Sequence, residues 1–223
     1  MKRKIALFVY QPYCSIECGN ATISALSSHY DFKMFSKQKV RDDFFDDVDI
    51  VCFPGGDGDS DSFDWLMKQN RNAITRFMQN GGRYLGICMG AYWADQNYFG
   101  FLKDSRAVQY ITQPNTDTRR PHAKAIQVNW QNQNERMYFY DGCAFTGNNF
   151  QTIATYSNGD AMAIRQGQLG LIGCHPESEE YWYNDYNYLT KHWHEKKHHT
   201  LLLDFVNQLC PGDGIGIHVS LRN

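Results

Sequence analysis

Short apolar runs alternate with helix-like segments along the first hundred residues. The expected strands are residues 5–10, 31–35, 48–53 and 84–87. The expected helices are residues 21–28, with an N-cap at Asn20, and residues 64–79, with a break near Asn70. Continuous apolar strands that alternate with helices are typical of parallel sheets buried on both faces. The pattern therefore predicts an α/β fold with a doubly wound, mostly parallel, flavodoxin-like sheet.

The second half of the chain has a different pattern. Short strand-like runs at hairpin spacing cover residues 125–130, 136–140, 152–156, 161–165 and 169–173. This spacing predicts an antiparallel extension of the sheet, whose last strand returns to the core. Residues 181–196 and 197–209 are expected to be helices. We therefore expect a single domain over residues 1–210 and a C-terminal tail over residues 211–223.

Composition narrows the class of protein and its partners. The 223 residues are 42% hydrophobic and carry a net charge of −2, so neither nucleic acid nor a membrane is an expected partner. Seven cysteines at irregular spacing indicate free thiols rather than a disulfide framework. The N-terminal apolar run is too short for a signal peptide, so a cytoplasmic protein is expected. The oligomeric state is not specified by these patterns.

The strand expected at residues 84–87 runs directly into a cysteine flanked by glycines. Cys88 lies between Gly86 and Gly90, which is the G-x-C-x-G form of a nucleophile elbow. Glycine is favoured on either side because the turn brings backbone segments close together. A following helix N-terminus would favour the thiolate. The alternative interpretation is a buried cysteine in an ordinary strand–helix turn.

A nucleophilic cysteine requires a base, and that base requires an orienting partner. His175 follows the strand expected at 169–173, and Glu177 lies two residues further on. The carboxylate of Glu177 can hold the His175 imidazole in the tautomer that accepts a proton from Cys88. A buried histidine with a purely structural role is the alternative.

Acyl chemistry also requires donors for a developing oxyanion. The backbone N–H of Met89, directly after Cys88, is one candidate. The N–H of Gly55 or Gly56 is the second, because the strand expected at residues 48–53 ends in Pro54-Gly-Gly.

Three motifs together resemble a known family: residues 53–56, 86–90 and 175–177 are similar to those of the class I glutamine amidotransferase-like fold. Residues 51–56, 72–78, 81–94 and 171–177 are most similar to the biotin-protein ligase N-terminal domain family, a branch of that fold. The resemblance implies a Cys88–His175–Glu177 triad. Tyr92, and Tyr181 close to Glu177, are candidates for the substrate pocket, with packing of an amphipathic helix as the alternative for Tyr181. No cofactor is expected. Glutamine-hydrolysing members have glutamine where this chain has Tyr92, so the resemblance implies a reactive cysteine but weakens glutamine as substrate. Biotin ligase activity is not expected, because the chain has no ligase catalytic domain.

Two further segments carry metal-like patterns. Residues 194–198 match H-E-x-x-H, so His194 and His198 are weak candidates for a zinc site, although a solvated basic helix face explains them as well. The acidic loop at residues 57–62 lacks the later ligands of a calcium loop, and we interpret it as a turn with a helix N-cap at Ser60 or Ser62.

Three functional hypotheses follow. The first is a cysteine hydrolase or amidotransferase-like enzyme that acts on a small-molecule amide or acyl substrate. The second is a non-catalytic small-molecule-binding or regulatory domain of the same fold. The third is a metal-dependent hydrolase that uses His194 and His198.

Overall fold

A computed structural model describes residues 2–57 and 59–210. The strands are β1 (Arg3–Phe8), β2 (Tyr30–Phe35), β3 (Ile50–Phe53), β4 (Arg83–Ile87), β5 (Ser105–Gln109), β6 (Lys124–Trp130), β7 (Gln133–Phe139), β8 (Cys143–Gly147), β9 (Gln151–Tyr156), β10 (Ala161–Gln166) and β11 (Leu169–Ile172). The helices are α1 (Ile16–Leu26), α2 (Ser60–Met67), α3 (Arg71–Gln79), α4 (Met89–Tyr92), α5 (Glu180–Asn184) and α6 (Lys197–Leu209), with 3-10 turns η1 (Tyr110–Thr112) and η2 (Thr190–His192).

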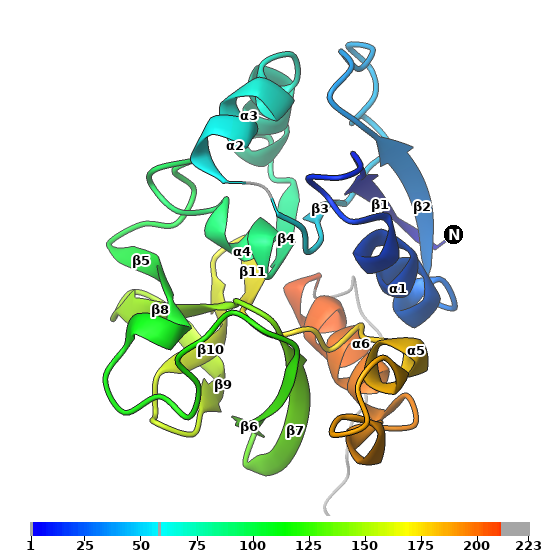
Figure 1. Ribbon diagram of the computed structural model, residues 1–223. Coiled ribbons are helices and arrows are strands. Elements are labelled where there is room, and N and C mark those ends of the chain that lie inside the picture. Colours follow the sequence, from blue (N-terminus) through cyan, green and yellow to red (C-terminus); the bar gives the residue numbers. More distant parts are fainter. Residues whose placement is uncertain (1, 58, 211–223) are drawn as a thin grey trace, which may run out of the picture.

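One mixed sheet runs through the molecule, in the order β2-β1-β3-β4-β11-β10-β9-β6-β7 (Figure 1). The strands from β2 to β11 are parallel, and this order is the flavodoxin-like one. The strands from β10 to β7 are antiparallel and, with the β5–β8 pair, occupy the lower left of the figure. The predicted doubly wound sheet with an antiparallel extension is confirmed.

Both faces of the parallel sheet are buried, which explains its continuous apolar strands. In β1, Ile5 and Leu7 belong to one hydrophobic cluster and Ala6 and Phe8 to another, as expected from the alternation of side chains along a strand. The first cluster includes side chains of α1 and α6, and the second includes side chains of α2 and α3. The helices therefore cover opposite faces of the sheet.

Several local expectations need correction. Ser15, not Asn20, caps α1, and Asp59, rather than Ser60 or Ser62, accepts the capping hydrogen bond at α2. Residues 181–196 form only α5 and η2. The helix after Cys88 has four residues, so a helix dipole contributes little there.

Some expectations about the ends of the chain and its compartment are not tested. The predicted tail at residues 211–223 lies outside the described residues, and the single domain over residues 1–210 stays a prediction. Among residues 2–57 and 59–210, no helix has both the length and the apolar character needed to cross a membrane.

The carboxyl ends of the parallel strands gather the segments on which the function hypotheses depend. Residues after β3 and β4 are the Pro-Gly-Gly loop and Cys88, and β11 leads to His175. The loop after β1 joins the same edge, since Cys14 forms a β-bridge with Gly56. Ligands bind at this edge in doubly wound sheets.

Candidate active site

Cys88 occupies a strained turn between β4 and α4. Its backbone has φ 51° and ψ −106°, a conformation that costs a non-glycine residue about 1–3 kcal/mol. Its N–H donates to the carbonyl oxygen of Ile172 at 2.8 Å, which fastens the turn to β11. A Cβ at Gly86 would lie 2.4 Å from the carbonyl oxygen of Gly90, and a Cβ at Gly90 would lie 1.8 Å from that of Phe53. The two glycines are therefore required for the turn to form against β3.

His175 reaches the same point from the neighbouring strand. Ile172 pairs with Ile87 in the parallel β4–β11 ladder, so the chain after β11 emerges beside Cys88. The N–H of His175 donates to the carbonyl oxygen of Tyr138 at 2.9 Å, and this bond holds the loop against β7. The ring also makes edge contacts with Tyr138 and Trp182.

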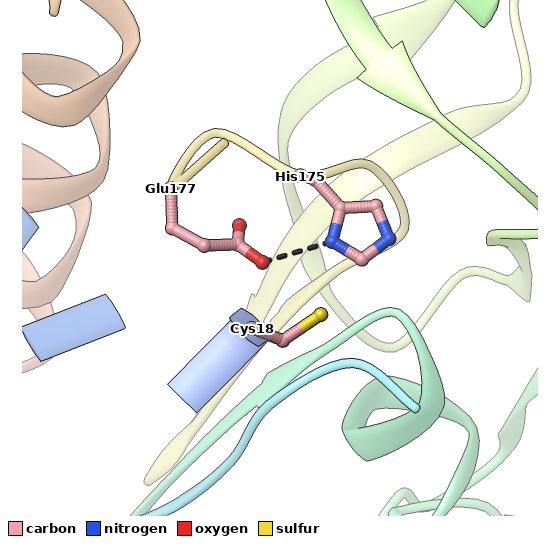
Figure 2. Close-up of side chains that lie close together, drawn as sticks. All are labelled: Cys18, His175 and Glu177. Atoms are coloured by element: carbon pink, nitrogen blue, oxygen red, sulfur yellow. Dashed lines mark hydrogen bonds and ion pairs between the residues drawn. The ribbon is translucent and has the colours of Figure 1, made fainter. Parts of the chain in front are cut away.

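Glu177 orients the His175 ring. Nδ1 of His175 lies 2.8 Å from Oε1 of Glu177, and Glu177 is fully buried (Figure 2). Burial alone would lower the pKa of His175, but the charge of Glu177 and interactions with the thiols of Cys88 and Cys18 raise that pKa well above its usual range. The arrangement therefore favours the protonated form of His175, the form that results when the ring takes a proton from a thiol.

A second thiol, which the sequence analysis did not assign to the site, lies beside His175. Figure 2 shows the sulfur of Cys18 directed towards the His175 ring, and this sulfur lies within 4.8 Å of a ring nitrogen of His175. Burial raises the pKa of Cys18, and the neighbouring His175 partly opposes that rise. Its place in the topology could have identified it, because Cys18 lies in the first turn of α1, the helix that follows the carboxyl end of β1.

The Pro-Gly-Gly loop and the residue after Cys88 both contribute to the cavity beside that cysteine. Gly56 and Met89 line the same cavity as Cys88. The N–H groups of Gly55 and Gly56 donate to no backbone carbonyl of the described residues. A Cβ at Gly55 would lie 2.7 Å from Cε1 of His175, so only glycine lets the loop pass so close to that ring.

The cavity has a volume of about 730 Å³, enough for a small-molecule ligand. Cys88, His175 and Tyr92 line it. The Tyr92 hydroxyl donates to the carbonyl oxygen of Asp141 at 3.3 Å, which ties the elbow to the antiparallel extension. Tyr181 is 47% exposed and does not line the cavity, whereas the neighbouring Trp182 does.

The geometry of metal-ligating side chains differs from the sequence expectation. Ligand atoms of Cys18, His175 and Glu177 lie within 4.8 Å of one another, and thiolate, imidazole and carboxylate are all zinc ligands. A metal there would compete with the His175–Glu177 hydrogen bond. No group of three such atoms in the part of the chain that the structure describes includes His194 or His198.

His194 and His198 instead form part of the packing around α6. Their rings stack with centroids 4.0 Å apart. Nε2 of His194 lies 3.3 Å from Oγ of Ser178, and Nε2 of His198 lies 3.2 Å from Oε2 of Glu135. Each ring thus has its own protein partner, which explains the H-E-x-x-H match structurally.

Comparison with known proteins agrees with the motifs. Residues 12–113 match the family model described as "Biotin-protein ligase, N terminal". That segment contains Cys88 and the Pro-Gly-Gly loop, whereas His175 and Glu177 lie beyond it. No curated protein matches the chain.

Solved structures extend the likeness to nearly the whole chain. A glutamine amidotransferase from Thermotoga maritima is 12% identical, with 95% of this chain and 100% of that chain covered and a TM-score of 0.67. PurLQS from Thermotoga maritima is 15% identical, with coverages of 92% and 100% and a TM-score of 0.59. A β-galactosidase from the psychrophilic Marinomonas ef1 is 9% identical, with coverages of 93% and 28% and a TM-score of 0.55. The chain therefore has the class I glutamine amidotransferase-like fold, and the predicted resemblance to the biotin-protein ligase N-terminal domain family is confirmed.

Proposed function

We propose that this protein, with its glutamine amidotransferase-like fold, is a cysteine-dependent hydrolase or amidotransferase-like enzyme that cleaves an amide C–N bond. The observation that carries the proposal is the connected series of Cys88, His175 and Glu177. Cys88 stands on a strained elbow, His175 lines the same cavity after the neighbouring strand, and Nδ1 of His175 lies 2.8 Å from Glu177. A nucleophile, a base and an orienting carboxylate in this order are the parts of a catalytic triad.

The first step in this mechanism is activation of the thiol. Because Nδ1 of His175 is engaged by Glu177, Nε2 is the nitrogen available to the Cys88 proton. Proton transfer gives a thiolate and an imidazolium, and the buried carboxylate of Glu177 stabilises the imidazolium. The thiolate attacks the amide carbon, and the carbonyl electron pair moves to oxygen.

The oxyanion then requires donors, which the N–H groups of Met89 and of Gly55 or Gly56 supply in this proposal. One such donor is typically worth a few kcal/mol of transition-state stabilisation. The imidazolium returns its proton to the leaving amine as the C–N bond breaks, which leaves a thioester on Cys88. Water, or another amine in a transfer reaction, attacks the thioester with His175 as base and frees the thiol.

Tyr92 supports a substrate other than glutamine. It stands four residues after Cys88, where glutamine-hydrolysing members carry the side chain that helps hold their substrate. Its hydroxyl is engaged with the backbone of Asp141. The substrate class is therefore expected to be a different small amide or related acyl compound.

The decisive experiment compares the reactivity of Cys88 and Cys18. Both thiols line the cavity together with His175, but only Cys88 stands on the elbow. With limiting iodoacetamide at neutral pH, we expect Cys88 to be labelled at least ~10-fold faster than Cys18 and the other five cysteines, as measured by peptide mass spectrometry. The His175→Asn variant should lose this selectivity.

Turnover is tested by ammonia release from a panel of primary amides. The Cys88→Ser variant should be inactive, and the matched Cys18→Ser variant should keep most of the activity. Equal labelling of all seven thiols in the wild-type protein would overturn the triad and favour the second hypothesis, a non-catalytic small-molecule-binding domain.

A further inference from the structure

Most of the charged side chains that line the active-site cavity are acidic. Five carboxylates line it: Glu17, Asp57, Asp59, Asp141 and Asp185. No lysine or arginine does so among the described residues, and His175 at the base of the cavity is committed to Glu177. The whole chain has a net charge of only −2, so acidic groups are concentrated at this opening. A cleft lined by charges of one sign attracts ligands of the opposite sign.

Asp141 is a lining carboxylate that is partly buried and has no cationic partner among the described residues. It is half-buried, and burial raises the pKa of its carboxyl group. Its two carboxylate oxygens accept hydrogen bonds from the neutral amide of Gln109, at 2.9 and 2.8 Å. Within residues 2–57 and 59–210, it forms no ion pair with a lysine or arginine. A carboxylate that is partly removed from water without a cationic partner is costly, and a cationic ligand would offset that cost.

The other four carboxylates are exposed around the cavity and also form no ion pairs with described lysine or arginine residues. Aromatic side chains line the same cavity: Tyr92, Tyr98, Tyr138, Tyr140 and Trp182. The faces of tyrosine and tryptophan rings attract organic cations. A cavity lined by both carboxylates and aromatic rings is therefore suited to an alkylammonium or guanidinium group.

We propose that this cavity selects amide substrates that carry a protonated amine or guanidinium group. Asp141 binds this cationic group while the amide carbon faces Cys88. This inference rests on the proposed function, because it names the substrate class of the same site. An anionic amide such as glutarate monoamide is selected against by the same charges.

The effect of the cavity charge on ligand entry is measured with two thiol reagents of similar size and opposite charge. The probes are the trimethylammonium-ethyl and sulfonatoethyl methanethiosulfonates, and the readout is the rate of Cys88 modification by peptide mass spectrometry. Each rate is divided by the rate of the same reagent with 2-mercaptoethanol. At low salt, we expect the cationic reagent to be favoured by about tenfold or more. The ratio should fall towards one as salt is raised.

The matched variants are Asp141→Asn and Asp204→Asn. Both remove one carboxylate, but Asp204 lies on α6 and does not line the cavity. We expect Asp141→Asn to lower the charge ratio at least about threefold, and Asp204→Asn to leave it unchanged. A wild-type ratio of one or less, or an equal effect of the two variants, would overturn the inference.

Turnover gives a second measurement. N-acetyl-lysinamide, N-acetyl-norleucinamide and the α-amide of N-acetylglutamate differ mainly in side-chain charge. Ammonia release should be fastest from the lysine compound, with kcat/KM at least about tenfold above the neutral analogue. A preference for the neutral or acidic compound would contradict the inference.

Failure of the substrate class and failure of the triad give different results. Selective iodoacetamide labelling of Cys88 without a charge preference supports the triad and rejects the cationic substrate. Unselective labelling with a strong charge preference rejects the triad and leaves a cation-binding cavity.

Discussion

At the scale of single residues, hydrogen bonds on two sides fix the position of His175. His175 is held by Glu177 on one side and by a backbone bond to Tyr138 on the other, with Cys18 and Cys88 at its ring. Because Glu177 is fully buried, its charge acts on His175 with little screening by water. Replacement of this one carboxylate therefore tests the base without altering the nucleophile.

We predict that Glu177→Gln lowers the pKa of His175 and reduces kcat/KM roughly 100-fold or more. The loss follows because Glu177 raises that pKa and fixes the position of the ring. An NMR titration of the His175 ring and a pH–rate profile measure the two effects. The control is Glu180→Gln, an exposed residue on α5, which should change neither. An unchanged His175 titration in Glu177→Gln would reject this account.

Gly90→Ala tests the crowding of the elbow. Its Cβ would lie 1.8 Å from the carbonyl oxygen of Phe53, so we expect a loss of stability of about 3 kcal/mol or more, measured by urea unfolding. Gly159→Ala is the comparison, because nothing lies within 4 Å of its Cβ and only its positive φ opposes the substitution. Similar losses in the two variants would show that crowding is not the cause.

At the scale of elements, Asn70 explains the break that the sequence predicts between two helices. It lies between α2 and α3 and is fully buried. Its side-chain oxygen accepts from the N–H of Val40 at 2.9 Å, and its amide donates to the carbonyl oxygens of Ser36 and Gln38 at 2.9 and 2.8 Å. One side chain therefore joins the helix junction to the loop after β2.

Asn70→Ala should reduce the free energy of unfolding by roughly 2–4 kcal/mol, since three buried backbone groups lose their partner. The matched variant is Asn72→Ala, which removes an exposed asparagine from α3. It should cost less than ~0.5 kcal/mol. Equal midpoints of denaturant unfolding in the two variants would contradict the assigned role of Asn70.

The elements that the sequence predicts well are those with strong periodicity. The apolar runs of β1, β3, β4 and β11 identify buried parallel strands, and their order along the chain places Cys88 and His175 at one edge. The pair β5 and β8 is missed, because Ser105–Gln109 and Cys143–Gly147 are short and mix small, polar and apolar residues. Their strand character depends on pairing with each other, which is a tertiary effect.

The composition of the cavity is missed for a similar reason. Glu17, Asp141 and Asp185 are far apart along the chain, and no local pattern relates them. Cys18 is close to His175 only because the loop after β1 folds over the Pro-Gly-Gly segment. Motif spacing therefore predicts the residues of the proposed triad, whereas the residues that line the rest of the cavity are brought together only by the fold.

At the scale of the whole molecule, buried histidines make the stability of the folded state depend on pH, and they do so in opposite directions. Burial lowers the pKa of His194 and of His198 to about 3, so both favour the folded state at neutral pH. Their contribution is present above pH 6.5, the unfolded value, and is lost as pH falls towards about 3. The raised pKa of His175 has the opposite sign, because its contribution is present at low pH and is lost as pH rises.

We predict that stability falls between pH 6.5 and 3 less steeply in a His194→Gln/His198→Asn double variant than in the wild-type protein. Each histidine that takes up a proton only on unfolding adds a slope of roughly one kcal/mol per pH unit. Urea unfolding across this range measures the slope, and the control is His29→Gln at an exposed position. If the double variant does not fold, NMR titration of both wild-type rings decides, and midpoints near 6.5 would contradict the prediction.

The parallel and antiparallel parts of the sheet contribute different residues to the candidate site. Cys88 and His175 follow neighbouring parallel strands, β4 and β11, whose ladder fixes their spacing. Gln109 and Asp141 belong to the antiparallel extension. If the proposed function holds, mutation or recombination of the extension could change which ligands bind while the proposed Cys88–His175 pair is inherited intact, so the two properties could diverge separately in evolution.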